Sequence, residues 1–357
     1  MDRLEYVAAR LLNYQLLFQT QKSELIMELI YFCPDVKKPV GGIKVIYRQA
    51  EVVQEIIRHK GVAVSVMHPN TWFFKIKWFE SKIKIRRGFF KWHWAAGKPS
   101  CSKIIGSFDS KKHMIVLPEL WARKYGHQLA DMGVPYAIFV QNGYYISKGN
   151  LDVLNKAYQS ARCIMTISED ATQCVALAFP GCESKILRVH CSVDGTRFRT
   201  VGLKENIITY MPRKLADHSS KVLFFLRNNL PAHWRIVPIQ GLSEEAVAKL
   251  LQRSKIFMSF SHFEGLGLPP IEAALAGNQV IGYTGQGGKE YWVPEIFDEI
   301  NSGDVMGFAK HVLLKVREMD QRNSFLLNAG AIQKLSGTYS VEQEKSDMRR
   351  FIEIMSL

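Results

Sequence analysis

Short apolar runs alternate along the chain with segments whose apolar residues recur at helical spacing. The runs lack a helical period, as buried parallel strands do, and they cover 25–33, 62–66, 114–119, 136–141, 163–167, 206–211, 234–239 and 255–259. Helices are predicted at 1–22, 44–58, 121–132, 151–160, 170–179 with Asp170 as cap, 243–251 with Ser243 as cap, and within 304–357. The alternation predicts an α/β protein.

The length of 357 residues exceeds that of one ordinary domain and suits two. An irregular polar stretch lies between Gly195 and Asn206, and such stretches mark loops between structured segments. We therefore predict a first domain at 1–203, a second at 204–338, and a final helical segment at 339–357.

The net charge of +14 is concentrated in the first half of the chain. Through Val201 there are 29 Lys and Arg against 16 Asp and Glu, and after it 18 against 17. An anionic partner is therefore expected for the first half. The six cysteines have no CxxC or zinc spacing, which predicts reduced thiols. No signal peptide or run of about eighteen apolar residues is found, so we expect a cytoplasmic protein, either soluble or peripheral at the inner face of the membrane.

The most informative stretch is 255–291, where a strand leads into EGLGLPP from Glu264 to Pro270. Strong helix formers then continue to Ala276 and end at Gly277, which predicts a short helix that begins at one of the prolines. The two loop glycines let backbone N–H groups approach a ligand, and the helix points its positive end at the same place. This loop predicts a phosphate-binding site.

Two carboxylates flank the loop, Glu264 before it and Glu272 in the helix. A carboxylate accepts paired hydrogen bonds from vicinal hydroxyls of a sugar. The same carboxylate would repel a diphosphate, so its place beside a phosphate-binding loop indicates that it recognises hydroxyls. A nucleotide sugar is therefore the expected ligand. The alternatives are a dinucleotide fingerprint, which lacks its third glycine here, and an ordinary strand-to-helix turn.

The sequence EGLGLPPIEA from Glu264, with Ala276-Gly277 and the apolar run 280–282, resembles the donor-site signature of retaining glycosyltransferases of family four. The resemblance implies the GT-B fold, in which two Rossmann-like domains face each other across a cleft and the C-terminal helix crosses back to the first domain. It also implies that Glu264 holds the transferred sugar and Glu272 the ribose, with the backbone of Gly265, Leu266, Gly267 and Leu268 against the donor.

The same resemblance implies donor-binding roles for two further glycine-containing loops. Gly41 and Gly42 follow the first strand, and the corresponding loop of the family faces the donor phosphates; a plain tight turn is the alternative. The turn at Gln240, Gly241 and Leu242 is similar to the loop whose backbone reads the nucleobase in the family.

The resemblance assigns the diphosphate to Arg213 and Lys214, which follow the strand 206–211. They are adjacent here, whereas the family spaces its arginine and lysine by several residues, so the choice between Lys214 and Lys221 stays open. Positive groups at this place would stabilise the charge that builds up on the leaving diphosphate.

Ligands of open parallel sheets collect beyond the carboxyl ends of the strands. His68, Glu119, Gln141 and Asn142 follow or end predicted strands of the first domain, and they are candidates for contact with acceptor or donor hydroxyls. Family members often carry a histidine after one of the later strands, where this chain has none. No acceptor base is assigned.

The stretch from Trp72 to Lys103 has nine basic and nine aromatic residues and one acid, Glu80. This composition suits an anionic bilayer, where each Lys or Arg contributes roughly 1 kcal/mol, or a nucleic-acid strand whose bases stack on the rings. Alternatively, some aromatics belong to the core, since 74–77 and 83–85 alternate as strands do. Beside a sugar-nucleotide site we expect the membrane surface and not nucleic acid.

We therefore predict retaining transfer of a sugar from a nucleotide diphosphate to a hydroxyl of a saccharide or lipid-linked acceptor, in cell-surface polysaccharide or glycolipid assembly. No cofactor or metal is expected, because Arg213 and Lys214 supply the positive charge and the chain has no Asp-x-Asp pair. The alternative is a non-catalytic membrane- or sugar-binding protein on a degenerate GT-B fold.

Overall fold

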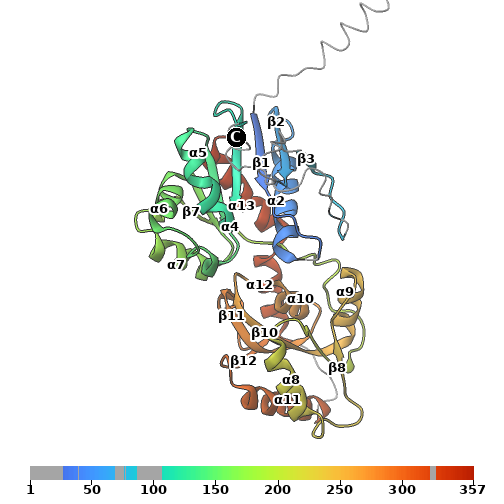
Figure 1. Ribbon diagram of the computed structural model, residues 1–357. Helices are drawn as coiled ribbons and strands as arrows, with labels where there is room; N and C mark the ends of the chain where they lie inside the picture. The colour runs from blue at the N-terminus through green and yellow to red at the C-terminus, as the bar shows by residue number, and fades with distance from the viewer. Residues whose placement is uncertain (1–26, 39, 69–75, 77, 87–106, 322–326) are drawn as a thin grey trace, which may run out of the picture.

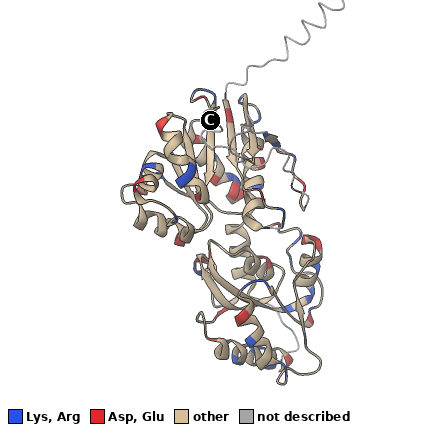
Figure 2. Cartoon of the chain, in the orientation of Figure 1, with Lys and Arg blue, Asp and Glu red and all other residues tan. Residues whose placement is uncertain are grey.

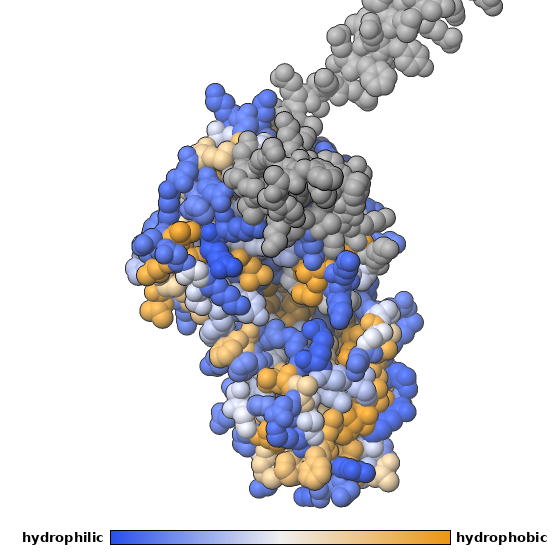
Figure 3. Space-filling model, viewed as in Figure 1, coloured by the Kyte–Doolittle hydropathy of each residue, from blue (hydrophilic) through white to orange (hydrophobic). Residues whose placement is uncertain are grey.

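The computed structural model describes residues 27–38, 40–68, 76, 78–86, 107–321 and 327–357. Two α/β domains follow each other along the long axis of the molecule, and each is built on one parallel sheet (Figure 1). The outline narrows between the domains, and apolar residues are exposed beside the narrowing (Figure 3). The predicted helix at 1–22 and most of the stretch from Trp72 to Lys103 lie outside the described residues.

The first domain contains a seven-stranded sheet in the order β3-β2-β1-β4-β5-β6-β7. Its strands are β1 (Met27–Phe32), β2 (Val62–Met67), β3 (Lys84–Arg86), β4 (His113–Pro118), β5 (Tyr136–Val140), β6 (Cys163–Thr166) and β7 (Ile186–Arg188). Its helices are α2 (Gly41–Ile57), α4 (Glu119–Trp121), α5 (His127–Asp131), α6 (Leu151–Ser160) and α7 (Glu169–Ala178). Every residue of β5 is buried, which explains why the strand is a continuous apolar run.

The second domain contains a five-stranded sheet in the order β12-β11-β10-β8-β9. Its strands are β8 (Glu205–Tyr210), β9 (Arg235–Pro238), β10 (Ser254–Glu264), β11 (Gln279–Gln286) and β12 (Phe297–Glu299). Its helices are α8 (Ala216–Leu226), α9 (Glu244–Arg253), α10 (Leu268–Leu275), α11 (Val305–Gln321) and α12 (Ala329–Thr338). The predicted domain boundary at 203/204 falls between β7 and β8.

The last helix, α13 (Val341–Met355), returns to the first domain and packs beside α2 (Figure 1). Buried carboxylates anchor it there. Glu344 accepts a hydrogen bond from Arg48 Nε at 2.9 Å, and Asp347 accepts one from the backbone N–H of His190 at 2.8 Å. The predicted arrangement of two parallel-sheet domains and a returning helix is present.

Several elements differ from their predicted form. α2 begins at Gly41 instead of Lys44, and β10 continues past 259 to Glu264. Ser168, not Asp170, caps α7 through its hydroxyl, which accepts from Ala171 N. The helix expected at 121–132 is divided by a π-helical turn at 122–126, and α8 is not predicted because its start has no capping side chain.

Candidate active site

Glu264 ends β10 and forms an ion pair with Lys214, which lies in the turn between β8 and α8. Both side chains are 27% exposed. Leu215, the next residue, has left-handed backbone angles (φ 41°, ψ 58°), which cost a non-glycine residue about 1 to 3 kcal/mol and cluster at functional sites. The structure therefore brings a predicted sugar-binding carboxylate together with a predicted diphosphate-binding cation.

The structure also distinguishes between Lys214 and Lys221, the two lysines that the sequence offers as diphosphate ligands. Lys221 lies about two turns along α8 and pairs with Asp217 on an exposed surface, whereas Lys214 reaches Glu264. Arg213 is exposed beside Lys214. The positions of these side chains favour Lys214 as the partner of a bound diphosphate.

The glycine-containing loop leads into α10 through Gly267, whose φ is +80°, a conformation that glycine adopts readily. Pro269 and Pro270 stand in the first turn and have no N–H to offer, so an anion must rely mainly on the N–H groups of 265–268. The hydroxyl of Tyr291 supports this loop, since it donates to Gly267 O at 2.7 Å and lies 3.2 Å from Leu266 O. The side chain of Leu266 is buried and anchors the loop in the core.

Gly265 touches the backbone of the first domain. A Cβ on this residue would lie 1.6 Å from Gln141 O, so only glycine fits. Next to it, Asn142 Nδ2 donates to Phe263 O at 2.6 Å. A Cβ on Gly42 would lie 2.7 Å from Oε1 of Gln141. Four predicted site residues therefore meet at one point of the seam between the domains.

Gly41 and Gly42 are the first residues of α2 and do not form a tight turn. The preceding Val40 gives no side-chain cap, and the first turn contains no acid. The start of this 17-residue helix therefore brings its positive end to the seam, beside Gln141.

Glu272 lies on α10 within a charged cluster that joins the domains. Lys44 of α2 pairs with Glu244 at the start of α9, and Arg197 Nη1 lies 2.8 Å from Glu244 Oε2. Figure 2 shows the acidic start of α9 beside the first domain. Burial, and next the charge of Glu244, raise the pKa of Glu272 to about 7, while Lys44 and Arg197 act in the opposite direction.

The sequence does not identify Lys44, Arg197 or Glu244 as site residues, because they come from three separate segments and belong to no motif. The predicted base-binding turn at Gln240, Gly241 and Leu242 is exposed and leads directly into α9. Gly241 has a φ of +68°, and Ser243 caps the helix as predicted by accepting from Ala246 N. The turn therefore lies close in sequence to Glu244, the carboxylate whose charge acts on Glu272.

Glu290 makes a third connection between the domains. It follows the glycines after β11, and its carboxylate accepts from the backbone N–H of Glu169 at 2.6 Å and from Tyr339 OH at 2.8 Å. It also pairs with Arg188. Gly287, three residues earlier, packs on Gly265, since an added Cβ would lie 1.9 Å from Gly265 O. The glycine loop is thus held from both sides.

His68 and Glu119 lie behind the surface of the seam. His68 is buried, with Nε2 2.7 Å from Tyr47 OH and Nδ1 3.3 Å from Asp35. Glu119 is also buried, and its carboxylate accepts from Gln141 N at 3.3 Å. These contacts favour a supporting role for both side chains: Glu119 holds the segment that carries Gln141, and His68 holds Tyr47 and Asp35.

Replacing Glu119 with glutamine should change how stability depends on pH. Burial raises the pKa of Glu119 from 4.5 to about 7, so between these values the folded chain binds more protons than the unfolded chain. The stabilising effect of the protonated carboxyl is therefore present below pH 4.5 and lost as pH rises through 7. We expect the variant to gain up to about 3 kcal/mol over wild type between pH 4.5 and 8. Urea midpoints measured at both pH values test this, and a pH-independent difference would contradict it.

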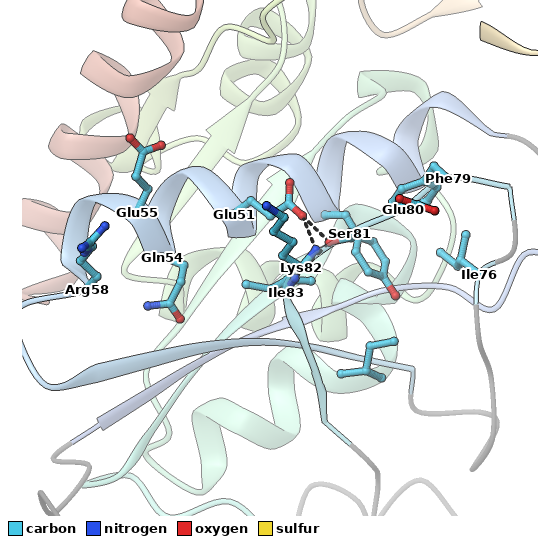
Figure 4. A pocket seen from close by; sticks show the side chains of 12 residues that line it. Glu51, Gln54, Glu55, Arg58, Ile76, Phe79, Glu80, Ser81, Lys82 and Ile83 are labelled. Carbon is cyan, nitrogen blue, oxygen red and sulfur yellow. Dashed lines mark hydrogen bonds between the residues drawn. The ribbon is translucent and has the colours of Figure 1, made fainter. Parts of the chain in front are cut away.

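A hollow of about 1350 Å³ lies over α2, between this helix and residues 76, 79–83 and 85 (Figure 4). Among the residues that line it, the Glu51 carboxylate accepts hydrogen bonds from Ser81 Oγ and from Lys82 N. It contains no predicted site residue. We assign it no function.

Within the described ranges, no three His, Cys, Asp or Glu side chains are gathered to hold a metal ion. In the same part of the chain, no helix has the length and apolar character needed to cross a membrane. The five described cysteines are free.

No family model matches this chain. The alpha-1,6-glucosyltransferase of Actinobacillus pleuropneumoniae serotype 7 is 30% identical over 115 residues, which are 32% of this chain and about a third (34%) of that protein. The chain is similar in structure to sucrose-phosphate synthase of Thermosynechococcus elongatus (TM-score 0.69, 12% identity, 92% of this chain and 98% of that chain). It is also similar to Anabaena HepE in complex with UDP-glucose (TM-score 0.67, 14% identity, 93% and 100%). These likenesses confirm the predicted fold class, the two-domain GT-B fold of glycosyltransferases.

Proposed function

We propose that this protein is a glycosyltransferase that transfers a sugar from a nucleotide diphosphate to an acceptor hydroxyl. The observation that carries the proposal is the pairing of Glu264 with Lys214 beside the glycine loop, at the carboxyl end of β10. The neighbour HepE is known with UDP-glucose, and a starch synthase of the same fold with ADP and acarbose. These ligands support a sugar nucleotide as donor.

Donor binding would exchange the partners of Lys214. The hollow lined by Lys214, Glu264 and Gly267 has a volume of about 20 Å³, room for roughly one water molecule. A donor therefore enters only when Lys214 leaves Glu264 and opens this hollow. Lys214 and Arg213 can then neutralise the diphosphate, and Glu264 becomes free to accept hydrogen bonds from the sugar hydroxyls.

The nucleoside would lie towards α9, where Glu272 can accept from the ribose hydroxyls and the 240–242 turn can contact the base. As its pKa is raised to about 7, Glu272 is a strong acceptor only above that pH. We include in the proposal a retained anomeric configuration, independence of metal ions, and a saccharide or lipid-linked acceptor. The cations at 213 and 214 support the second of these, because they supply the charge that a metal would otherwise supply.

A contact with an anionic membrane through Trp72 to Lys103 is the remaining part of the proposal. In the described part of this stretch, Lys82, Lys84 and Ile85 are exposed on or beside the edge strand β3, while Trp78 packs on Phe79 at 4.7 Å. Charged and apolar side chains on one exposed edge suit a bilayer surface. Equal co-sedimentation with neutral and phosphatidylserine vesicles would contradict it.

Thermal unfolding with a panel of nucleotide sugars, in the presence of EDTA, tests the donor site. A ligand at 100 times its Kd should stabilise the chain by about 2.7 kcal/mol. Lys214→Ala should lose this rise in Tm, whereas Lys221→Ala, which alters an exposed pair on α8, should keep it. If no nucleotide sugar raises Tm, the proposed function fails. A rise in Tm without transfer to saccharide or lipid-linked acceptors would indicate the non-catalytic alternative.

A further inference from the structure

A pocket of about 280 Å³ opens beyond the carboxyl ends of β10, β11 and β12, and the donor site does not account for it. Its volume is near the lower limit of ligand pockets, about 300 Å³, which suits one sugar ring better than a whole sugar nucleotide. The residues most relevant to binding are His262, Phe263, Thr284, Gln286, Glu299 and Asn301.

The pocket adjoins the reacting centre. Ser261 lines both this pocket and the hollow that contains Glu264. Gln286 is paired in register with Glu264 across β10 and β11. A group bound here would therefore lie next to the sugar that Glu264 holds, on the side away from Glu272.

The lining chemistry matches a sugar ring. Thr284, Gln286, Glu299 and Asn301 provide hydroxyl, amide and carboxylate groups, which can exchange hydrogen bonds with sugar hydroxyls. Lys289 is the one Lys or Arg among the lining residues, and Glu299 lies in the same pocket. The balance of charge does not favour a phosphate.

Phe263 adds an apolar surface at the rim. Its side chain is 50% exposed, although its ring contacts His262 (centroids 4.1 Å apart) and Tyr144 of the first domain (4.8 Å). An aromatic face beside convergent polar groups is the combination that ligand sites use for orientation and affinity. Because Tyr144 belongs to the other domain, this rim forms where the domains meet.

Gln286 has a strained backbone, with φ 74° and ψ −70°. Such a conformation costs a non-glycine residue roughly 1 to 3 kcal/mol, and it occurs at ligand sites more than elsewhere. Glycine would fit the position without strain. A glutamine retained at this cost points to a use for its side chain.

We propose that this pocket binds a neutral sugar residue of the acceptor and that Phe263 and Gln286 select it. The inference rests on the proposed function, since it names the substrate class of the same reaction. The acceptor hydroxyl would reach the donor sugar from the side of Gln286, while the donor diphosphate remains at Lys214.

The test is a titration of the nucleotide-free full chain with methyl glycosides of glucose, galactose, N-acetylglucosamine and glucuronic acid, followed by saturation-transfer NMR. We expect a neutral glycoside to bind wild type, and Phe263→Ala to weaken its binding about tenfold. Gln286→Gly removes the amide while relieving strain, so lost binding cannot be attributed to misfolding. Phe224→Ala removes another exposed phenylalanine (69% exposed, on α8) and should bind normally.

Binding of none of the neutral glycosides, or binding unchanged in both pocket variants, would overturn the inference. Preferential binding of the glucuronide would overturn the choice of a neutral ring. Donor binding separates the two proposals, because the pocket variants should keep the Tm rise produced by the nucleotide sugar. If they lose that rise, the pocket reads the donor sugar and the acceptor assignment is wrong.

Discussion

Replacing Gly265 with alanine should reduce sugar transfer at least about 100-fold while both domains stay folded. The added methyl group would lie 1.6 Å from Gln141 O, and this oxygen belongs to a backbone that cannot rotate away. The seam must therefore open, which moves the glycine loop relative to the first domain. A misplacement of about 1 Å between reacting groups is enough for a loss of this size. Initial transfer rates and circular dichroism measure the two effects.

Two glycines of the same seam provide the controls. Gly41→Ala has no atom within 4 Å of the new Cβ and lies in the first turn of α2, so it leaves the seam closed, should lower transfer far less than Gly265→Ala, and should gain up to about 1 kcal/mol in stability. Gly42→Ala meets only the side chain of Gln141 and should show an intermediate rate. Wild-type transfer by the Gly265 variant would show that closure of this seam is not required.

Replacing Glu264 with glutamine should reduce kcat/KM for transfer about 100-fold or more without unfolding the chain. The variant has the same shape, but it loses the charge that holds Lys214 and that, in the proposed function, accepts from the sugar hydroxyls. Hydrogen bonds to a charged group contribute about 1.5 to 3 kcal/mol, and charge stabilisation in the transition state adds to this. Arg213→Ala should also abolish turnover, because it removes charge from the diphosphate site.

Stability should hardly change in the Glu264 variant. The Lys214–Glu264 pair is about a quarter exposed (27%), and such pairs contribute at most about 1 kcal/mol. Glu245→Gln is the matched control, since Glu245 pairs with Lys249 at 2.7 Å on the exposed face of α9. This control should transfer sugar at the wild-type rate. Normal turnover in both Glu264→Gln and Arg213→Ala would refute the site assignment.

The strands and the glycine-containing loop before α10 could be predicted because their signals are local. β5 is buried along its whole length, and burial on both faces requires an apolar side chain at every position. Gly267 precedes α10 with a positive φ. This backbone conformation favours glycine, so the residue type in the sequence marks the position. The two glutamates and the prolines around it are close enough in the chain to form a recognisable motif.

The helix α8 and the contacts between the two domains could not be predicted from local sequence patterns. α8 starts at a left-handed Leu215 without a side-chain cap, so the usual start signal is missing. Asn142 meets Phe263 O although 121 residues separate them, and Lys44 pairs with Glu244 over 200 residues. The sequence around either residue of such a contact does not indicate which distant residue it will meet.

By itself, therefore, the sequence determined the α/β class, the second domain's glycine-containing loop before a short helix and the presence of a carboxylate at each end of it, because periodicity and turn chemistry act over a few residues. Only the tertiary structure decided that Lys214 is the lysine at Glu264, that Glu119 and His68 are buried supports, and that Gly265 lies on Gln141. These depend on how two sheets and a returning helix pack, and packing joins residues that are far apart in the chain.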